Sequence, residues 1–510
     1  MLARLRSSAT LGIDAYLVDV EVDLANGLPF FATVGLPQGA VKEGRERVGA
    51  ALVNSGFEFP LKRITVNLAP ADVRKDGSAF DLPIALGVLA ASGQIAPEAL
   101  AHSVFVGELG LEGDLRAVRG ILPMALAARD EGARAFVTPT ANVAEAAIVC
   151  GIDVIGAASL SQLVRHLRGV APIQPAPANI HSPLPHADTG EEPDFVDVRG
   201  QRAAKRALEI AAAGGHNVLL IGPPGAGKTM LARRLPSILP TPSLEEAIEI
   251  TRVHSVAGLL PPGSALLSAR PFRAPHHTIS DAGLIGGGSV PRPGEVSLAH
   301  GGVLFLDELP EFHRHVLEVL RQPMEDGHVT LSRASGRLTF PARFTLIAAM
   351  NPCPCGHHGS STRPCACGPI AIQRYRSRIS GPLLDRIDLH LQVSALPFTD
   401  FAADFVGESS LTVRSRVEAA RQRQRGRCQR GRGVQANAHL SSREVRRLCP
   451  QTPEIADLLR IAMERLGLSA RGCYRVLKVA RTIADLAGSD QLAAGHVHEA
   501  LQYRGFGVAG

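Results

Sequence analysis

The sequence predicts an α/β protein built from about three domains, and three observations support this. The chain has 510 residues, whereas one domain usually holds roughly 100–200. Residues 1–168 alternate strand-like runs such as RITVNLAP with alanine-rich helical runs such as DLPIALGVLAASG. A second α/β pattern begins at residue 195, and from about residue 399 the chain reads as polar helices without a strand signal.

The segment between the two α/β regions differs from both in composition. Residues 171–194 (APIQPAPANIHSPLPHADTGEEPD) are rich in proline and polar residues and show no hydrophobic period. We therefore expect an N-terminal domain at 1–168, a linker at 169–194, a second α/β domain at 195–398 and a helical domain at 399–510.

The composition and the lengths of the apolar runs limit the classes of protein to which this chain can belong. Hydrophobic residues make up 45% and charged residues 20% of the chain, which is ordinary for a folded protein. Acidic residues from Asp14 to Asp23 interrupt the N-terminal apolar stretch before an export signal forms. The longest apolar run, at 82–91, is shorter than the roughly 20 residues that cross a bilayer. We therefore expect a cytoplasmic protein that does not span a membrane. The formal net charge of +6 is by itself weak support for nucleic-acid binding.

A phosphate-binding loop follows the apolar run NVLLIG. Residues 222–229 read GPPGAGKT, which fits G-x-x-x-x-G-K-[ST], and a helical pattern follows them. Small residues let backbone N–H groups surround the phosphates of ATP at the start of that helix. We expect Lys228 to reach the β- and γ-phosphates and Thr229 to ligate Mg²⁺. The expected nucleotide-binding residues are Gly222, Pro223, Pro224, Gly225, Ala226, Gly227, Lys228 and Thr229.

Two later apolar runs also end in polar residues. Asp307 and Glu308 follow VLFL, and Asn351 follows IAAM. We expect Asp307 to bind Mg²⁺ and Glu308 to act as the base that orients the attacking water. Asn351 is a candidate for holding that water in place.

Arginines late in the chain are candidates for contacts with the nucleotide. Within SRISGPLLDRIDLH, Arg386 could neutralise γ-phosphate charge in the site of a neighbouring subunit. An ion pair with Asp385 or Asp388 is the alternative role. Arg471, at the start of a late helix, could contact the same nucleotide, and Arg475 is the second choice.

Four of the eight cysteines form two C-x-C pairs separated by nine residues: Cys353, Cys355, Cys365 and Cys367. Four thiolates on one short loop can close a tetrahedral zinc site. The spacing departs from the usual two-residue gap, so structural zinc and free thiols both remain open. His357 and His358 are potential substitutes for a cysteine ligand.

Clusters of arginine indicate where DNA could bind. Residues 414–432 hold eight arginines and one acid, and such a run attracts phosphates without reading sequence, although a solvated helix face is the alternative. Arg333 and Arg337 flank the turn of a hairpin predicted by HVTLSRASGRLTFP. A hairpin of this kind would suit a loop that enters the channel of a ring and grips a DNA backbone.

Together these motifs resemble the YifB/ComM family of magnesium-chelatase-like AAA+ proteins over nearly the whole chain. The resemblance lies in GPPGAGKT, PFRAPHHTIS, GGVLFLDELPEF, AAMNPCPCG, SRISGPLLDRIDLH and SARGCYRVLKVARTIADL. It implies a hexameric ring with an AAA+ ATPase domain at 195–398 and a C-terminal helical lid. It also implies a DNA helicase that promotes branch migration during homologous recombination and natural transformation.

The N-terminal region is similar to the Lon protease domain fold through VRKDGSAFDLPIAL and VFVGELGLEGDLRAVRGILPMALAA. In that alignment Ala79 stands where the nucleophilic serine belongs and Leu122 where its lysine belongs, and Ser78 is displaced by one residue. Acyl-enzyme chemistry requires a serine activated by a neighbouring amine. We therefore expect this domain to be a proteolytically inactive scaffold.

The leading hypothesis is an ATP-driven translocase or helicase on branched DNA. The alternative is a chelatase motor subunit that drives metal insertion into a porphyrin, which would need a separate porphyrin-binding partner. An ATP-dependent protease would lack its catalytic dyad. A scaffold with a degenerate ATPase conflicts with the presence of Lys228, Asp307 and Glu308.

Overall fold

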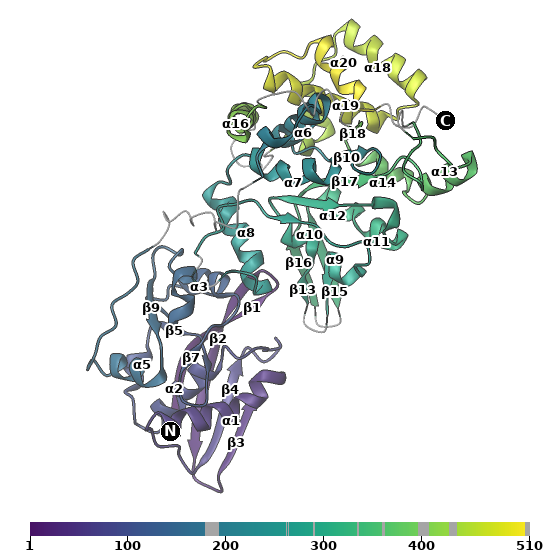
Figure 1. Ribbon diagram of the computed structural model, residues 1–510. Coiled ribbons are helices and arrows are strands. Elements are labelled where there is room, and N and C mark those ends of the chain that lie inside the picture. Colours follow the sequence, from purple (N-terminus) through teal and green to yellow (C-terminus); the bar gives the residue numbers. More distant parts are fainter. Residues whose placement is uncertain are drawn as a thin grey trace. The chain divides into compact units, whose positions relative to one another are not determined.

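Two compact units make up the computed structural model of the chain (Figure 1). The first contains Met1–Ala187, Leu244–Ser268 and Ser332–Phe340, and the second contains Asp188–Ser243, Ala269–Leu331 and Pro341–Gly510. The structure describes residues 1–178, 193–261, 263, 265–288, 291–333, 336–359, 363–395, 407–427 and 436–504, without the side chains of Ala40, Lys42 and Arg333. Most of the expected linker therefore lies outside the described residues.

A seven-stranded sheet forms the centre of the first unit, with the order β3-β4-β2-β1-β5-β8-β9. Along β2, Val18, Val20 and Val22 are fully buried while the alternate acidic residues reach solvent, which is the period of two of a half-buried strand. The strands are β1 Leu2–Leu11, β2 Asp14–Ala25, β3 Phe30–Val34, β4 Arg63–Ala69, β5 Ser103–Phe105, β8 Ala135–Pro139 and β9 Asp153–Ala157. A small hairpin joins β6 (Glu108–Leu109) to β7 (Leu115–Arg116).

Helices cover this sheet, and one of them comes from a distant part of the sequence. The helices are α1 Gly39–Asn54, α2 Asp81–Ala91, α3 Ile121–Asp130, α4 Val143–Ala146, α5 Leu160–Leu167 and α8 Leu244–Ala257. Helix α8 packs with α3, and the carbonyl of Ser255 accepts the backbone N–H of Gly120 at 3.2 Å. The range expected for the second α/β domain therefore contains a segment that packs with the N-terminal residues. The three domain boundaries themselves stay a prediction.

The two positions that the sequence comparison aligns with the protease dyad are apolar. Ala79 and Leu122 are both buried in one hydrophobic cluster, together with Val104 and Val106. The Ser78 hydroxyl donates a hydrogen bond to the Glu108 carboxylate. The side chains that replace the dyad thus serve as packing in the core.

A parallel five-stranded sheet forms the centre of the second unit, with the order β11-β14-β17-β10-β18. In β10, Val218 and Leu220 join one hydrophobic cluster, while Leu219 and Ile221 join another on the opposite face. Burial of both faces explains why each strand reads as an uninterrupted apolar run. The strands are β10 Val218–Ile221, β11 Phe272–Arg273, β14 Val303–Leu306, β17 Thr345–Met350 and β18 Leu389–Gln392.

The helices of the second unit lie around this sheet and beyond it toward the C-terminus (Figure 1). Those between residues 202 and 385 are α6 Arg202–Gly214, α7 Lys228–Ile238, α9 Asp281–Ile285, α10 Glu295–Leu298, α11 Arg314–Val319, α12 Arg321–Asp326, α13 Pro369–Arg376 and α14 Gly381–Asp385. The C-terminal helices are α16 Ser410–Arg427, α17 Ser442–Leu448, α18 Pro453–Leu466, α19 Ala470–Leu486 and α20 Ala494–Gln502. A single hydrophobic cluster includes residues of α6, α7, β10 and α19, so the C-terminal helices share a core with the parallel sheet and the helices beside it.

Two short two-stranded sheets complete the described part of the chain. One pairs β12 (Gly286–Gly287) with β13 (Arg292–Pro293), and the other pairs β15 (His328–Arg333) with β16 (Gly336–Pro341). The second of these confirms the hairpin predicted from the sequence. Within the described residues, no helix has the length and apolar character needed to cross a membrane.

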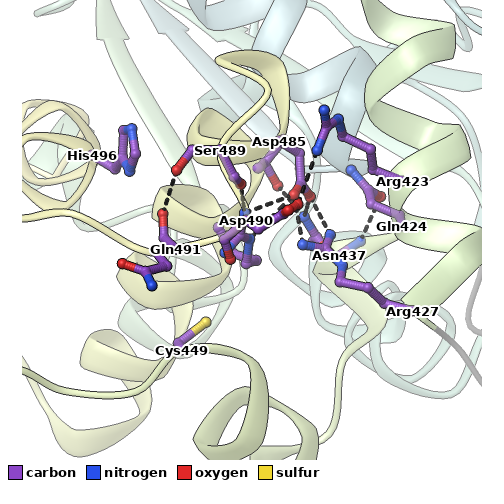
Figure 2. Close-up of polar contacts among 12 residues, drawn as sticks. Arg423, Gln424, Arg427, Asn437, Cys449, Asp485, Ser489, Asp490, Gln491 and His496 are labelled. Atoms are coloured by element: carbon purple, nitrogen blue, oxygen red, sulfur yellow. Dashed lines mark hydrogen bonds and ion pairs between the residues drawn. The ribbon is translucent and has the colours of Figure 1, made fainter.

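A buried polar network connects α16 with α19 (Figure 2). Asp485 is 3% exposed and Arg481 1% exposed, and their side chains are 3.0 Å apart. Arg427 Nη1 donates to the same Asp485 carboxylate at 2.6 Å, and Asn437 Nδ2 donates to it at 2.8 Å. One buried carboxylate is thus paired with two guanidinium groups, which satisfies charges that would be costly to bury alone.

The network continues toward the start of the parallel sheet. Asn437 Nδ2 also donates to Thr482 Oγ1 at 3.0 Å, and Thr482 Oγ1 lies 2.8 Å from His216 Nε2. His216 Nδ1 lies 3.2 Å from Asp388, just before β18. Burial lowers the pKa of His216, which favours its neutral form. Directional contacts therefore fix the C-terminal helices against the base of the sheet.

The Asp485 network gives a prediction about stability. Asp485→Asn removes the negative charge without opening a cavity and leaves two arginines without their carboxylate, so we expect a loss of about 3–5 kcal/mol. The matched control is Asp490→Asn, because the side chain of Asp490 is 96% exposed and its carboxylate pairs with Arg423 at 3.0 Å. Denaturant unfolding followed by circular dichroism measures both variants. Equal destabilisation of the two would contradict the role given to Asp485.

Candidate ATP-binding site

The parallel sheet brings three strand ends to one edge of the second unit. Strands β10, β14 and β17 end at Ile221, Leu306 and Met350, and Ile221 pairs directly with Met350. Residues that follow neighbouring parallel strands meet at the carboxyl edge of the sheet, where α/β proteins bind ligands. The P-loop (residues 222–229), the pair Asp307–Glu308, and Asn351 all begin there.

The P-loop has the backbone of a phosphate cradle. Gly225 and Gly227 have φ angles of +77° and +85°, which favour glycine. A Cβ at Gly222 would lie 2.2 Å from the carbonyl oxygen of Val393, so only glycine fits beside β18. A Cβ at Gly225 would meet nothing within 4 Å, so this part of the loop borders open space. Helix α7 begins at Lys228, and its first N–H groups and dipole favour an anion.

Lys228 points back into this loop. Its Nζ donates to the carbonyl of Gly222 at 2.7 Å, to that of Pro223 at 3.0 Å and to Asn351 Oδ1 at 3.0 Å. Burial lowers the pKa of Lys228, and the negative charges of Asp307 and Glu308 oppose this shift. All three acceptors are neutral, so the ammonium group remains available to a phosphate oxygen.

Thr229 and Asp307 supply oxygen atoms suited to Mg²⁺. The Thr229 hydroxyl donates to Asp307 Oδ2 at 2.8 Å, and Asp307 Oδ1 accepts the backbone N–H of Glu308 at 2.9 Å. A hydroxyl and a carboxylate beside a phosphate cradle are hard ligands of the kind that Mg²⁺ uses with nucleotides. The residues present therefore fit a bound Mg²⁺ together with ATP.

Glu308 has a constrained backbone, and the side chain of His277 lies near its carboxylate. Its φ is +52°, a left-handed conformation that costs energy for a residue with a side chain and is common at functional sites. Its carboxylate lies 3.8 Å from His277 Nδ1, and the His277 ring packs edge-on against Phe312. In the sequence, His277 lies within PFRAPHHTIS, a stretch that marks the family resemblance but by itself assigns no role to this histidine. The two adjacent histidines in this stretch are the sequence feature that could have indicated a functional residue here.

The four cysteines of the predicted zinc site lie together next to Asn351. The Sγ of Cys353 lies 3.4 Å from that of Cys355 and 3.7 Å from that of Cys365, and Cys355 and Cys365 are 3.6 Å apart. With Cys367 included, all four sulfurs lie within 4.8 Å of one another. Backbone hydrogen bonds from His357 and Ala366 lower the pKa of Cys355 to about 6. The four candidate ligands therefore lie together, which is compatible with Zn²⁺, and the metal itself stays a proposal.

The cysteine loop packs directly on the P-loop. Gly356, with a φ of +83°, lies so close to Pro224 that an added Cβ would be 2.6 Å from the proline Cδ. The backbone N–H of Gly222 donates to the carbonyl of Met350 at 3.2 Å, just before Asn351. The end of β17, the cysteine loop and the P-loop therefore form one packed assembly.

The candidate arginines occupy different environments. The side chain of Arg386 is 17% exposed, and its Nη2 pairs with Glu325 at 2.5 Å, a partner the sequence analysis did not name. Arg475 Nη1 contacts Asp388 at 3.0 Å and the carbonyl of Arg386 at 3.1 Å. Arg471 is exposed in the first turn of α19. Of these three side chains, that of Arg471 is the most accessible to a ligand.

The arginine-rich segment has a structural role in its described part. Five of its arginines contact protein groups in the second unit: Arg414 with Ser237, Arg416 with Glu209 and Glu408, Arg421 with Ala212, Arg423 with Asp490 and Arg427 with Asp485. Residues 428–432 lie outside the described residues. The predicted attraction of this segment for DNA is therefore limited, because most of the described guanidinium groups already have partners. Arg337 is exposed on β16, and the side chain of Arg333 is not described.

Comparison with known proteins identifies the family. Residues 194–401 match the family described as magnesium chelatase, subunit ChlI, and residues 407–504 match its C-terminal region. The chain is 46% identical over 509 residues to "Competence protein ComM" of Haemophilus influenzae, covering 99% of this chain and 97% of that protein. This chain belongs to the YifB/ComM family of magnesium-chelatase-like AAA+ proteins. "Uncharacterized protein YifB" of Salmonella typhimurium is 46% identical over 508 residues, with the same coverage of 99% and 97%.

Shorter matches describe parts of this family member. Residues 20–142 match the family "Subunit ChlI of Mg-chelatase". Lon protease 2 of Bacillus subtilis is 32% identical over 148 residues, which covers 28% of this chain and 26% of the protease. The magnesium-chelatase 38 kDa subunit of Rhodobacter capsulatus is 28% identical over 177 residues, covering 31% of this chain and 50% of that subunit. The predicted fold class is confirmed: a Lon-like α/β region, an AAA+ region and C-terminal helices.

The contact between Gly356 and Pro224 yields a prediction about ATP binding. Gly356→Ala places a methyl group against the P-loop proline, so we expect affinity for a fluorescent ATP analogue to fall by roughly tenfold. Gly359→Ala is the matched control, because Gly359 also has a positive φ, +75°, but its Cβ would meet nothing within 4 Å. Both variants carry the same type of backbone strain. Similar affinities in the two would show that the contact does not position the P-loop.

Proposed function

We propose that this protein hydrolyses ATP to drive a ring-shaped motor on DNA, and that it promotes branch migration during homologous recombination and natural transformation. The observation that carries the ATP part is the convergence of Lys228, Thr229, Asp307, Glu308 and Asn351 on one sheet edge. The identity of 46% to Competence protein ComM supports a substrate among the DNA that competent cells process. Both the hexameric state and the helicase activity are part of the proposal.

Each residue at the sheet edge has a separate task in this proposal. The P-loop N–H groups and Lys228 bind the phosphates, and Asn351 orients the Lys228 ammonium through their 3.0 Å contact. Glu308 orients the attacking water, and His277 lies close enough to influence the position of the Glu308 carboxylate. Thr229 and Asp307 hold Mg²⁺, which when bound neutralises charge on the β- and γ-phosphates.

Arg386 is proposed to act on the nucleotide of a neighbouring subunit. In the single chain its guanidinium pairs with Glu325, whose side chain is 51% exposed, and its Nη1 donates to the Pro382 carbonyl at 2.7 Å. A partly exposed ion pair is weak enough to exchange for a phosphate contact. Arg471 is proposed to contact the same nucleotide from the C-terminal helices, because its side chain is exposed.

The hairpin β15–β16 is the proposed DNA contact. Arg337 is exposed there, and Arg333 lies at the other side of the turn. The described arginines of α16 are mostly engaged within the protein, so the proposal does not rest on them. Contacts from a hairpin to phosphates would be independent of sequence, as a motor that moves along DNA requires.

The chelatase alternative has less support. The similarity to the magnesium-chelatase 38 kDa subunit covers 31% of this chain at 28% identity, whereas the similarity to ComM covers 99% at 46%. We therefore favour DNA over a porphyrin as the substrate.

Steady-state ATP hydrolysis with and without branched DNA tests the motor. We expect DNA to raise turnover of the wild type, and raised salt to reduce that rise, because phosphate contacts release counterions. Lys228→Ala should weaken nucleotide binding, and Glu308→Gln should keep binding but lose hydrolysis, because only the water-orienting carboxylate changes. Arg337→Ala should reduce the stimulation by DNA more than Arg465→Ala, a control that removes one exposed arginine on α18. Turnover that ignores DNA would contradict a DNA motor, and an unwinding assay on branched DNA is the next step.

Mixing two inactive variants tests the position of Arg386. Arg386→Ala should be inactive because each site lacks the neighbour's cation, and Lys228→Ala because each site lacks its own lysine. In an equal mixture about a quarter of the interfaces would combine an intact Lys228 with an intact Arg386, so activity should partly return. Size-exclusion chromatography with light scattering checks that the subunits assemble. A mixture as inactive as its components, in rings shown to exchange subunits, would place Arg386 outside the neighbour's site.

A further inference from the structure

We propose that Cys353, Cys355, Cys365 and Cys367 bind one Zn²⁺, and that this ion fixes Asn351 and Pro224 at the ATP site. ATP binding and turnover would then depend on a metal that does not touch the nucleotide. The effect on turnover rests on the proposed function, whereas metal binding and the effect on ATP affinity do not.

The spacing of the sulfurs fits a single ion. Four sulfurs at about 2.3 Å from a tetrahedral Zn²⁺ are about 3.8 Å from one another. The three distances among Cys353, Cys355 and Cys365 are 3.4, 3.7 and 3.6 Å. Cys367 lies within 4.8 Å of the others, so closure needs a shift of about 1 Å. The same distances are far longer than the bond of about 2.05 Å in a disulfide, so the four are separate thiols.

The chemistry of the cluster selects a soft cation. All four ligand atoms of this cluster are sulfurs, which favours Zn²⁺ over Mg²⁺. Backbone N–H groups point at the sulfurs: that of His358 at Cys353 at 3.3 Å, and that of Cys367 at Cys365 at 3.4 Å. Such donors orient metal-bound thiolates and stabilise their charge. Cys353 is fully buried, so one ligand is anchored in the protein core.

The cluster closes a loop that begins and ends at fixed elements. Strand β17 ends at Met350, two residues before Pro352, and α13 begins at Pro369, two residues after Cys367. The described residues between them contain neither helix nor strand. Arg376 of α13 also donates to the carbonyl of Pro352 at 3.3 Å. Because little regular structure stabilises this loop, a metal that ties both its ends contributes strongly to its conformation.

Two contacts link the position of this loop to residues of the candidate nucleotide site. Asn351 is two residues before Cys353 and contacts Lys228 at 3.0 Å. Gly356 follows Cys355 and packs on Pro224, with room for no side chain. Without the ion, Asn351 and Pro224 would lose one side of their support. Displacements of about 1 Å at a catalytic site can lower turnover by roughly 100-fold.

Metal analysis of the purified full-length protein is the first measurement. We expect about one zinc per chain in the wild type, as for a closed structural site. Cys365→Ser and Cys367→Ser should lose this zinc, and both positions are only half-buried, so the substitutions disturb the core little. Cys150→Ser is the matched control, since Cys150 is exposed and lies in the first unit. Zinc content well below one per chain, or iron in place of zinc, would overturn the metal site.

Cobalt gives a readout that does not depend on variants folding. The wild type is stripped with a zinc-selective chelator, which is removed before Co²⁺ is added. We expect the absorption bands of a tetrahedral cobalt–thiolate site, and their loss when Zn²⁺ displaces the cobalt. Bands of octahedral Co²⁺ would overturn the four-sulfur site.

The link to the nucleotide is tested on the same samples. Removal of zinc should weaken binding of a fluorescent ATP analogue and reduce kcat by about 10- to 100-fold, and added Zn²⁺ should restore both. Lys228→Ala should keep its zinc while binding ATP poorly, which separates the metal site from the nucleotide site. Unchanged ATP affinity after complete removal of zinc would overturn the link. A wild type that contains zinc and binds ATP but never hydrolyses it would contradict the proposed function alone.

Discussion

The parallel alignment of β10, β14 and β17 is the constraint on which the rest of the site depends. Their strand ends lie at one edge, so residues separated by more than 120 positions in sequence, such as Lys228 and Asn351, can form a 3.0 Å contact. The strands remain in place because both of their faces are buried in separate hydrophobic clusters. The core therefore fixes where the strand ends of the candidate site lie, and the P-loop and the cysteine loop begin from those ends.

Much of this site could be predicted because its signals are local in sequence. The P-loop, Asp307 and Asn351 each follow a short apolar run, and such runs identify buried parallel strands and their carboxyl ends. The role of the α16 arginines could not be predicted, because partners such as Glu209 and Asp485 are distant in sequence. His277 was missed for the same reason, since only the fold brings it near Glu308.

The arginines of α16 have a structural role as well as a charge. Arg416, Arg423 and Arg427 pair with carboxylates of the same unit, although the side chains of Arg416 and Arg423 remain 39% and 43% exposed. Through Asp485, Arg427 is connected to Asn437, Thr482 and His216, which join the C-terminal helices to the sheet that carries the candidate nucleotide site.

Helix α8 affects how the protein can be divided into fragments. It packs on α3 in the first unit, although it follows α7 of the second unit in sequence. A fragment that ends at residue 168 would lack α8 and expose apolar residues of α3 to water. Such a fragment would tend to aggregate because apolar surface that α8 normally covers would be exposed to solvent. By the same logic, a protease cut between residues 171 and 194 would leave part of the first unit on the C-terminal fragment.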